Sequence, residues 1–309
     1  MTIVTTDIEQ AAEALRRGEL VAFSTETVYG LGADATNGKA VAAIYEAKGR
    51  PSFNPLIVHV PSLQAALHLG RFNADARKLA HALWPGPLTI VVERSPDCPV
   101  SELVSAGLTS IAIRVPGHDG ARALLASAGV PVAAPSANRS GQISPTRPEH
   151  VLAGLGGRIW GVLDMGPCEV GLESTIVACL DDETVLLRPG GVSREQLEAV
   201  LGKPVLTAQA NSEAPVAPGQ LESHYAPHAR VRLNATSVRE GEVMLGFGPV
   251  DGALNLSPSG DLKEAAANLF AMLHALDTTG VDAIAVAPVP DHGLGAAIND
   301  RLNRAAAPR

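Results

Sequence analysis

The sequence predicts an α/β protein with one large domain followed by a smaller one. Up to about residue 200, short apolar runs rich in β-branched residues alternate with segments whose apolar residues recur at helical spacing. Residues 203–222 then show little periodicity and are rich in Pro, Ala and small polar residues, which is typical of a linker. Because strand and helix patterns resume afterwards, we expect a first domain over 1–202, a linker over 203–228 and a second α/β domain over 229–309.

The elements of the first domain follow from apolar periodicity and from capping residues. Asp7 can cap a helix that runs to Arg17 and ends at Gly18. Ser193 and Gln196 form a capping-box pattern before a helix that ends near residue 201. The apolar runs predict strands over 20–24, 56–60, 88–93, 110–115, 130–134 and 159–163, and a hairpin over 174–180 and 184–187. Helical periodicity predicts helices over 39–48, 74–84, 120–128 and 148–155.

The second domain has the same kind of pattern on a smaller scale. Apolar runs predict strands over 242–247 and 283–289, and amphipathic periodicity predicts helices over 262–276 and 296–307. No stretch of the chain approaches about 18 uninterrupted apolar residues, and the start lacks a basic region followed by an apolar run. The three cysteines are odd in number and form no CxxC pair, which favours neither a disulfide framework nor a zinc ribbon. We therefore expect a cytoplasmic protein that does not span a membrane.

Charge and composition limit the classes of ligand. The formal net charge is −8 and aromatic residues make up 3% of the chain. An acidic chain is poorly suited to broad capture of a nucleic-acid backbone or an anionic membrane, and stacking platforms for single strands are scarce. Any phosphate ligand must therefore meet a local cluster of basic residues.

Three segments carry polar groups near the ends of predicted elements, two of them at strand exits, where α/β proteins place ligand-binding residues. STETVYGLG follows the first strand, although its GLGADA continuation fails as a dinucleotide fingerprint because the glycines open no helix. KGRP reads equally as a helix stop, but Asn54 and His59 follow it closely. APSANRSG supplies hydroxyl and amide donors suited to ribose and phosphate oxygens. A polar loop without a ligand remains the alternative for STETVYGLG, and a plain helix stop remains the alternative for KGRP.

Two further features leave alternatives open. Arg114 stands in an apolar strand, where a buried guanidinium needs an anion, and that anion is either a ligand group or an Asp or Glu of this chain. His224 and His228 have the spacing of paired metal ligands, but Pro227 disfavours the helix that would align them. The chain contains neither a Walker A sequence nor a G-x-S-x-G elbow, so ATP would not bind in a P-loop and a serine-hydrolase site is not indicated.

Seven motifs in order resemble one known family. STETVYGLG, KGRPSFNPLIVH, SIAIRVP, APSANRSG, ESTI, LRPGG and SHYAPH are similar to the threonylcarbamoyl-AMP synthases of the YrdC-like superfamily, in the long form with a C-terminal domain. The ending GLGAAINDRLNRAA also resembles that form, whereas Ser24 stands where the family usually has proline. The resemblance implies a twisted, open mixed sheet with a concave cavity that binds ATP and L-threonine side by side, and a linker that folds over the opening as a lid.

The resemblance also assigns residues and a reaction. Bicarbonate, L-threonine and ATP with Mg²⁺ would give threonylcarbamoyl-AMP and pyrophosphate without tRNA, for a downstream threonylcarbamoyl transferase. Lys48 and Arg50 would act in catalysis by neutralising charge on the phosphates. The residues implied for threonine are Thr27, His59, Arg114, Ala134 and Ser174. The residues implied for ATP are Lys48, Arg50, Asn54, Ser110, Ser136, Asn138, Ser144, Arg188 and Tyr225.

Two other classes of function compete with this one. YrdC-like domains look suited to cradling RNA, but an RNA-binding regulatory module would be marked by excess positive charge. A carbamoyl-transferring maturation factor shares the domain but resembles proteins with additional zinc-binding segments, which the cysteine count does not support. A threonine-dependent adenylate product, detected by mass spectrometry, would distinguish these three hypotheses.

Overall fold

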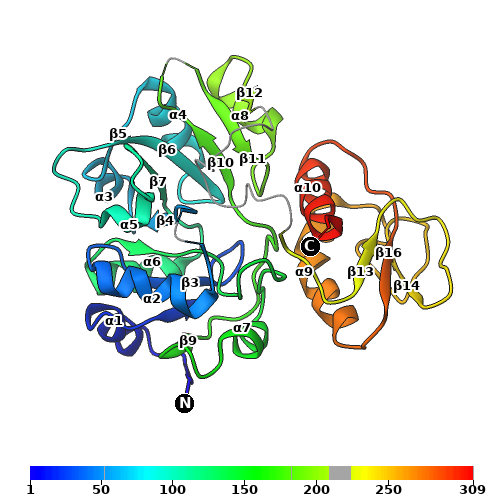
Figure 1. The fold of residues 1–309 in the computed structure, drawn as a ribbon. Coiled ribbons are helices and arrows are strands. Elements are labelled where there is room, and N and C mark those ends of the chain that lie inside the picture. The colour runs from blue at the N-terminus through cyan, green and yellow to red at the C-terminus, as the bar shows by residue number, and fades with distance from the viewer. Residues whose placement is uncertain (52, 182, 209–223, 309) are drawn as a thin grey trace.

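The computed structural model of the protein describes residues 1–51, 53–181, 183–208 and 224–308. Two α/β units follow one another along the chain, and the second lies beside the first (Figure 1). Most of the predicted linker and lid, residues 209–223, lies outside the described residues.

The predicted strands and helices of the first domain are all present, with ends that differ by a few residues at most. Its strands are β1 (Ile3–Thr5), β2 (Val21–Phe23), β3 (Gly30–Asp34), β4 (Ile57–His59), β5 (Gly70–Arg71), β6 (Leu88–Arg94), β7 (Ser110–Arg114), β8 (Val132–Ala133), β9 (Gly161–Leu163), β10 (Thr175–Ala178), β11 (Val185–Arg188) and β12 (Leu206–Thr207). Its helices are α1 (Ile8–Arg16), α2 (Gly38–Lys48), α3 (Leu63–Leu67), α4 (Ala74–Leu83), α5 (Glu102–Ser105), α6 (Asp119–Ala128), α7 (Pro148–Leu155) and α8 (Arg194–Leu201).

The strands of the first domain form one mixed sheet. Within the described residues its order is β1-β9-β2-β3-β8-β4-β7-β6-β10-β11-β12, with β5 paired to β6. The predicted hairpin is confirmed, because β10 and β11 pair antiparallel, whereas β4 and β7 are parallel. β12 pairs with β11, so the sheet continues beyond residue 202, into the segment predicted as linker. The α/β fold with a large mixed sheet is thus confirmed.

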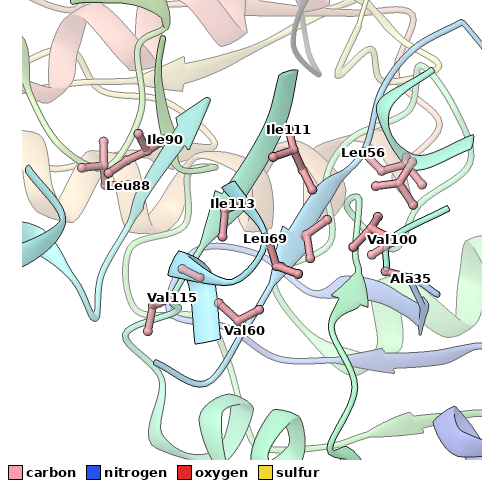
Figure 2. Packing of buried hydrophobic residues seen from close by; sticks show 14 of the residues in the cluster. Ala35, Leu56, Val60, Leu69, Leu88, Ile90, Val100, Ile111, Ile113 and Val115 are labelled. Carbon is pink, nitrogen blue, oxygen red and sulfur yellow. The ribbon is translucent and has the colours of Figure 1, made fainter. Parts of the chain in front are cut away.

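The core lies mainly on one face of this sheet. Ile111 and Ile113 of β7 point into it together with Leu88 and Ile90 of the neighbouring β6 (Figure 2). Buried residues of α2, α4, α7 and α8 belong to the same cluster. Ala112, between them, points to the opposite face and packs with Ile57 and Val91, as the two-residue period of a strand requires. On that opposite face, α1 and α6 pack against β2, β8 and β9. These two helices leave the opposite face of β4, β7 and β10 for the cavity described below.

The second domain is a four-stranded parallel sheet with two helices. Its elements are β13 (Arg230–Arg232), β14 (Glu242–Gly246), β15 (Leu254–Asn255), α9 (Leu262–Asp277), β16 (Ala283–Val286) and α10 (Leu294–Ala306). The strand order is β13-β16-β14-β15, and α9 packs against α10 (Figure 1).

The second domain packs directly on the first. Leu172 belongs to the same buried cluster as residues of α9 and α10. Gly171 lies so close to α9 that a Cβ there would come within 2.6 Å of the Ala266 carbonyl oxygen. This contact explains a glycine at that position, and it fixes helix α9 beside the segment that leads into β10.

The sequence patterns did not predict strand β3. Its residues were assigned to a polar turn because Gly30 and Gly32 are poor strand formers. In the structure, a Cβ at Gly32 would lie 2.9 Å from the Phe23 ring and 3.0 Å from Val132. Close packing between β2 and β8 therefore requires glycine where propensity disfavours a strand. None of the helices in the described part of the chain is long and apolar enough to cross a membrane.

Candidate active site

A cavity lies where several strands of the large sheet end. It is enclosed by the turn after β2, the segments after α2 and β8, the ends of β4, β7 and β11, and the entry to β10. These segments converge from positions far apart in the sequence, as ligand sites of α/β sheets do. The lining residues are Thr25, Thr27, Val28, Gly30, Arg50, Ile57, His59, Arg114, Ala134, Pro135, Ser136, Glu173, Ser174, Arg188, His224 and Tyr225.

The cavity brings together many of the residues predicted to bind substrates. All five residues assigned to threonine line it: Thr27, His59, Arg114, Ala134 and Ser174. Four of the residues assigned to ATP also line it: Arg50, Ser136, Arg188 and Tyr225. The other five residues assigned to ATP are not among the lining residues: Lys48, Asn54, Ser110, Asn138 and Ser144.

Arg114 has a partner within the chain. Its Nη2 donates to Glu26 Oε1 at 2.5 Å, and its Nη1 donates to Thr27 Oγ1 at 2.9 Å. Both members of the ion pair are buried. Burial alone would raise the pKa of Glu26, but the charge of Arg114 and a backbone hydrogen bond from Gly117 outweigh it, so the pKa lies below its usual range. Of the two partners left open by the sequence, a carboxylate of this chain is present, and it orients the guanidinium at the cavity wall.

His59 is held neutral beside this pair. Burial lowers the pKa of His59 to about 3, and the positive charge of Arg114 adds to the effect. Its Nδ1 lies 3.3 Å from the Ile57 carbonyl oxygen, which can only accept a hydrogen bond. The contact therefore favours the tautomer with the proton on Nδ1, which leaves Nε2 as an acceptor. A neutral imidazole can hydrogen-bond an ammonium or hydroxyl group of a substrate without repelling it.

Arg50 and Arg188 add positive charge to the cavity lining. Arg50 donates to the carbonyls of Asn54 at 3.3 Å and Pro55 at 3.0 Å. Arg188 donates to the Ser174 carbonyl at 2.9 Å. Burial lowers the pKa of Arg50 to about 10, so its guanidinium stays charged at neutral pH. These two side chains form the local basic cluster that an acidic chain needs to bind phosphate.

Lys48 supports the cavity wall from behind. It is buried, and its Nζ donates to the carbonyl oxygens of Ser136 and Asn138. Burial lowers the pKa of Lys48 well below its usual value, and the charge of Arg50 contributes. Lys48 thus fixes the loop that carries Ser136, whatever contact it makes with a ligand.

The four remaining residues assigned to ATP differ in their surroundings. Asn54 is buried, and neither of its side-chain polar atoms has a partner among the described residues; Asn138 Oδ1 also lacks one. Ser144 donates through Oγ to Glu173 Oε1, and Ser110 begins β7. Buried amide atoms without partners are rare in folded proteins, so a hydrogen-bonding ligand here would remove a deficit.

The two histidines of the HYAPH segment lie in different environments. His224 is buried against the Tyr225 ring, with ring centroids 4.1 Å apart. His228 is exposed and its Nδ1 lies 2.8 Å from Asp277 Oδ2. In the described parts of the chain, no group of three or more His, Cys, Asp or Glu side chains is arranged to hold a metal.

Sequence reasoning missed Glu173 and Arg301. Glu173 lines the cavity, and its Oε2 accepts from Arg301 Nε of helix α10 at 2.7 Å. Both had a signal in the sequence, since Glu173 stands in an apolar segment, and Arg301 lies between the buried Ile298 and Leu302 of a helix. A charge in either position needs a partner, just as Arg114 does.

Comparisons with known proteins cover both domains. A family model described as "Telomere recombination" matches residues 13–190, and one described as "Threonylcarbamoyl-AMP synthase, C-terminal domain" matches residues 192–307. The threonylcarbamoyl-AMP synthase of Bacillus subtilis is 44% identical over 98% of this chain and 93% of its own length. The one from Pyrococcus abyssi is 39% identical over 96% of this chain and 93% of its own. This chain belongs to the threonylcarbamoyl-AMP synthase family.

Solved structures agree with this family assignment. The crystal structure of Pyrococcus abyssi Sua5 complexed with L-threonine has a TM-score of 0.90, 37% identity, and covers 99% of this chain and 97% of its own. The resemblance to long-form threonylcarbamoyl-AMP synthases is therefore confirmed. The nucleotide-bound HypF structure is 16% identical and covers 62% of this chain and 30% of its own, so it shares the fold alone. That likeness does not favour the maturation-factor hypothesis over membership of the threonylcarbamoyl-AMP synthase family.

Proposed function

We propose that this chain joins L-threonine, bicarbonate and ATP into threonylcarbamoyl-AMP and releases pyrophosphate. One observation carries the proposal: the five residues implied for threonine and four of those implied for ATP line a single cavity. A similar protein has been solved in complex with L-threonine, which supports the amino-acid substrate. The product would supply a downstream threonylcarbamoyl transferase that modifies adenosine in tRNA, and we expect the chain to act in the cytoplasm.

The reaction has two bond-forming steps. The threonine amine attacks carbon dioxide derived from bicarbonate, loses a proton and becomes a carbamate, while the water from bicarbonate is released. A carbamate oxygen then attacks the α-phosphorus of ATP, the bond to the β-phosphate oxygen breaks, and pyrophosphate leaves. The protein has little covalent chemistry to do, so orientation and charge neutralisation account for most of the catalysis.

The cavity residues suit these tasks. Arg114 presents a planar guanidinium that matches the threonine carboxylate, while Glu26 and Thr27 fix its orientation. Neutral His59 lies beside it and can accept a hydrogen bond from the threonine amine or hydroxyl. Arg50 and Arg188 would offset the charge that develops on the phosphates. No described residue is assigned as a general base.

Magnesium would reach this site with ATP. Glu173 in the cavity lining and Glu26 beside it are each engaged by an arginine, at 2.7 and 2.5 Å, so neither is committed to a metal. That arrangement fits an ion held through substrate phosphates and water, as Mg²⁺ prefers. When bound there, Mg²⁺ would neutralise phosphate charge alongside Arg50 and Arg188.

The test is a defined mixture of purified protein, ATP, MgCl₂, bicarbonate and L-threonine. We expect pyrophosphate release and an adenylate of the mass of threonylcarbamoyl-AMP, both lost when any one component is omitted and both independent of tRNA. ¹³C-bicarbonate should raise the product mass by one unit, which places the bicarbonate carbon in the product. Pyrophosphate release that ignores threonine, or that needs RNA, would refute the proposal.

A further inference from the structure

Helix α10 of the second domain contacts a cavity-lining carboxylate of the first domain through Arg301. This side chain is fully buried, and its Nε donates to Glu173 Oε2 at 2.7 Å. Its Nη1 contacts Asp300, and its Nη2 has no hydrogen-bond partner among the described residues. Arg301 is not itself a lining residue of the cavity, whereas Glu173 is. The arginine therefore stands directly behind a carboxylate of the cavity wall.

Arg301 also contacts a second lining residue, Tyr225. The guanidinium carbon lies 5.1 Å from the centroid of the Tyr225 ring, within the range of a cation–π interaction. Tyr225 has a φ of 61°, a left-handed conformation that a residue with a bulky side chain adopts only when its surroundings hold it. Phe270 of α9 packs 5.6 Å from the same ring, and the His224 amide donates to the Arg304 carbonyl at 3.2 Å. The two helices of the second domain thus hold the 224–225 segment in place.

The pair with Arg301 decides what charge the cavity presents to a nucleotide. Burial by itself would raise the pKa of Glu173, but Arg301 and then Arg188 outweigh it, so Glu173 remains ionised. Without Arg301, Glu173 in its ionised form would have Arg188 as the remaining arginine to compensate its charge. It would then attract Arg188 and repel phosphate groups within the same cavity.

We propose that Arg301 is a positioning residue for the nucleotide half of the site. It neutralises Glu173 and holds Tyr225, so that the charge of Arg188 acts on ATP phosphates rather than on an uncompensated carboxylate. This inference rests on the proposed function in that it takes ATP as the ligand. Through the Arg301 side chain, the second domain thus forms part of the nucleotide site.

The test compares ATP affinity, measured by isothermal titration calorimetry, among matched variants. Arg301→Met keeps the length of the side chain but removes its charge, and we expect it to weaken ATP binding by about tenfold or more. Glu173→Gln in the same chain removes the uncompensated charge and keeps the acceptor for Ser144. We expect the Arg301→Met/Glu173→Gln double variant to return to within about threefold of the wild-type affinity. A loss of packing alone would not be rescued by a second change in the partner.

Arg232→Met is the control for loss of an arginine from the second domain. Arg232 donates to both oxygens of Glu242, at 2.8 and 2.5 Å, within that domain and outside the cavity lining. ATP affinity of this variant should equal that of the wild type. If Arg301→Met binds ATP as well as Arg232→Met does, or if the double variant binds no better than Arg301→Met, the proposal is wrong.

Two further measurements keep the test decisive. If Arg301→Met fails to fold, Arg301→Lys replaces it: retention of ATP affinity within about threefold supports charge neutralisation, and a loss of tenfold or more overturns it. A wild-type protein that binds ATP but forms no threonylcarbamoyl-AMP would refute the proposed function, while the ATP affinities of the variants would still decide the role of Arg301. A wild-type protein that binds no ATP would overturn both.

Discussion

Replacing Arg114 should separate a structural role from a binding role, because the structure gives this side chain a partner within the protein. Arg114→Ala leaves the buried Glu26 carboxylate without its cation, and breaking a buried ion pair costs roughly 3–5 kcal/mol of unfolding free energy. The same change removes the guanidinium proposed to bind the threonine carboxylate. Losing that charge-assisted contact costs roughly 1.5–3 kcal/mol, or about ten- to hundred-fold in the KM for threonine. The KM for ATP should be nearly unchanged.

The two effects separate when Glu26→Gln is added. The double variant Arg114→Ala/Glu26→Gln no longer buries an unpaired charge, so much of the lost stability should return. The KM for threonine should stay high, because a glutamine at position 26 cannot replace the guanidinium. Urea unfolding measures the stability, and pyrophosphate release at varied threonine concentrations measures the KM.

Arg71→Ala is the matched control, since Arg71 pairs with Glu93 on the same sheet with both side chains exposed. Neither stability nor the KM for threonine should change appreciably in this variant. If the double variant regains threonine affinity together with stability, the role of Arg114 is to pair with Glu26. Its assignment to the threonine carboxylate would then be refuted.

Three more variants test other parts of the structure. Lys48→Met removes both hydrogen bonds to the Ser136 and Asn138 carbonyls. Turnover should therefore fall about ten- to hundred-fold, and urea unfolding should show lower stability. Full stability with reduced turnover would instead indicate that Lys48 acts on the phosphates alone. Gly190→Ala should abolish activity, because a Cβ there would lie 2.4 Å from the Glu173 carbonyl oxygen. Gly154 in α7 has room for a Cβ, so Gly154→Ala should stabilise the fold by up to about 1 kcal/mol, measured by thermal melts. His150→Gln should flatten the loss of stability on acidification. Burial, His274 and Arg147 lower the pKa of His150 to about 3, so the unfolded state binds the proton first and stability decreases at pH values below about 6.5. For this residue the decrease should be about 1.4 kcal/mol at pH 5.5. Equal slopes of unfolding free energy against pH in the two proteins would contradict this assignment.

Local signals in the sequence predicted the elements well where caps and periodicity agree. Helix α7 begins at Pro148 and ends at Leu155 as predicted, because Pro suits a first helical position and Gly156 follows the last. Helix α8 carries the capping box formed by Ser193 and Gln196. The order of the strands was beyond such signals, since β4 lies between β7 and β8 only through packing among distant segments.

The part of the candidate site that lies within the sequence motifs could be predicted. The motifs identified most of the polar cavity wall, including Arg114 and Arg188, because each lies at a strand end within a recognisable sequence. Lys48 was assigned a direct role on phosphate, whereas its contacts with two carbonyls arise from the path of a loop nearly 90 residues away along the chain. The contact between Glu173 and Arg301 depends on how the second domain packs on the first, which no local pattern specifies.

Two buried ion pairs at the cavity each neutralise a glutamate, but the arginines of the two pairs lie in different positions relative to the cavity. A chain with a net charge of −8 must present positive charge to ATP and to a carboxylate, yet two glutamates lie in or beside the cavity wall. Each glutamate is neutralised by an arginine from a distant segment, Glu26 by Arg114 and Glu173 by Arg301. The pairs differ in one respect, because Arg114 lines the cavity and Arg301 lies behind it. A glutamine at position 26 can therefore restore only stability to a chain without Arg114, whereas a glutamine at position 173 can restore ligand affinity to a chain without Arg301. The contrast between these two double variants distinguishes an arginine that binds substrate from one that positions the residues that do.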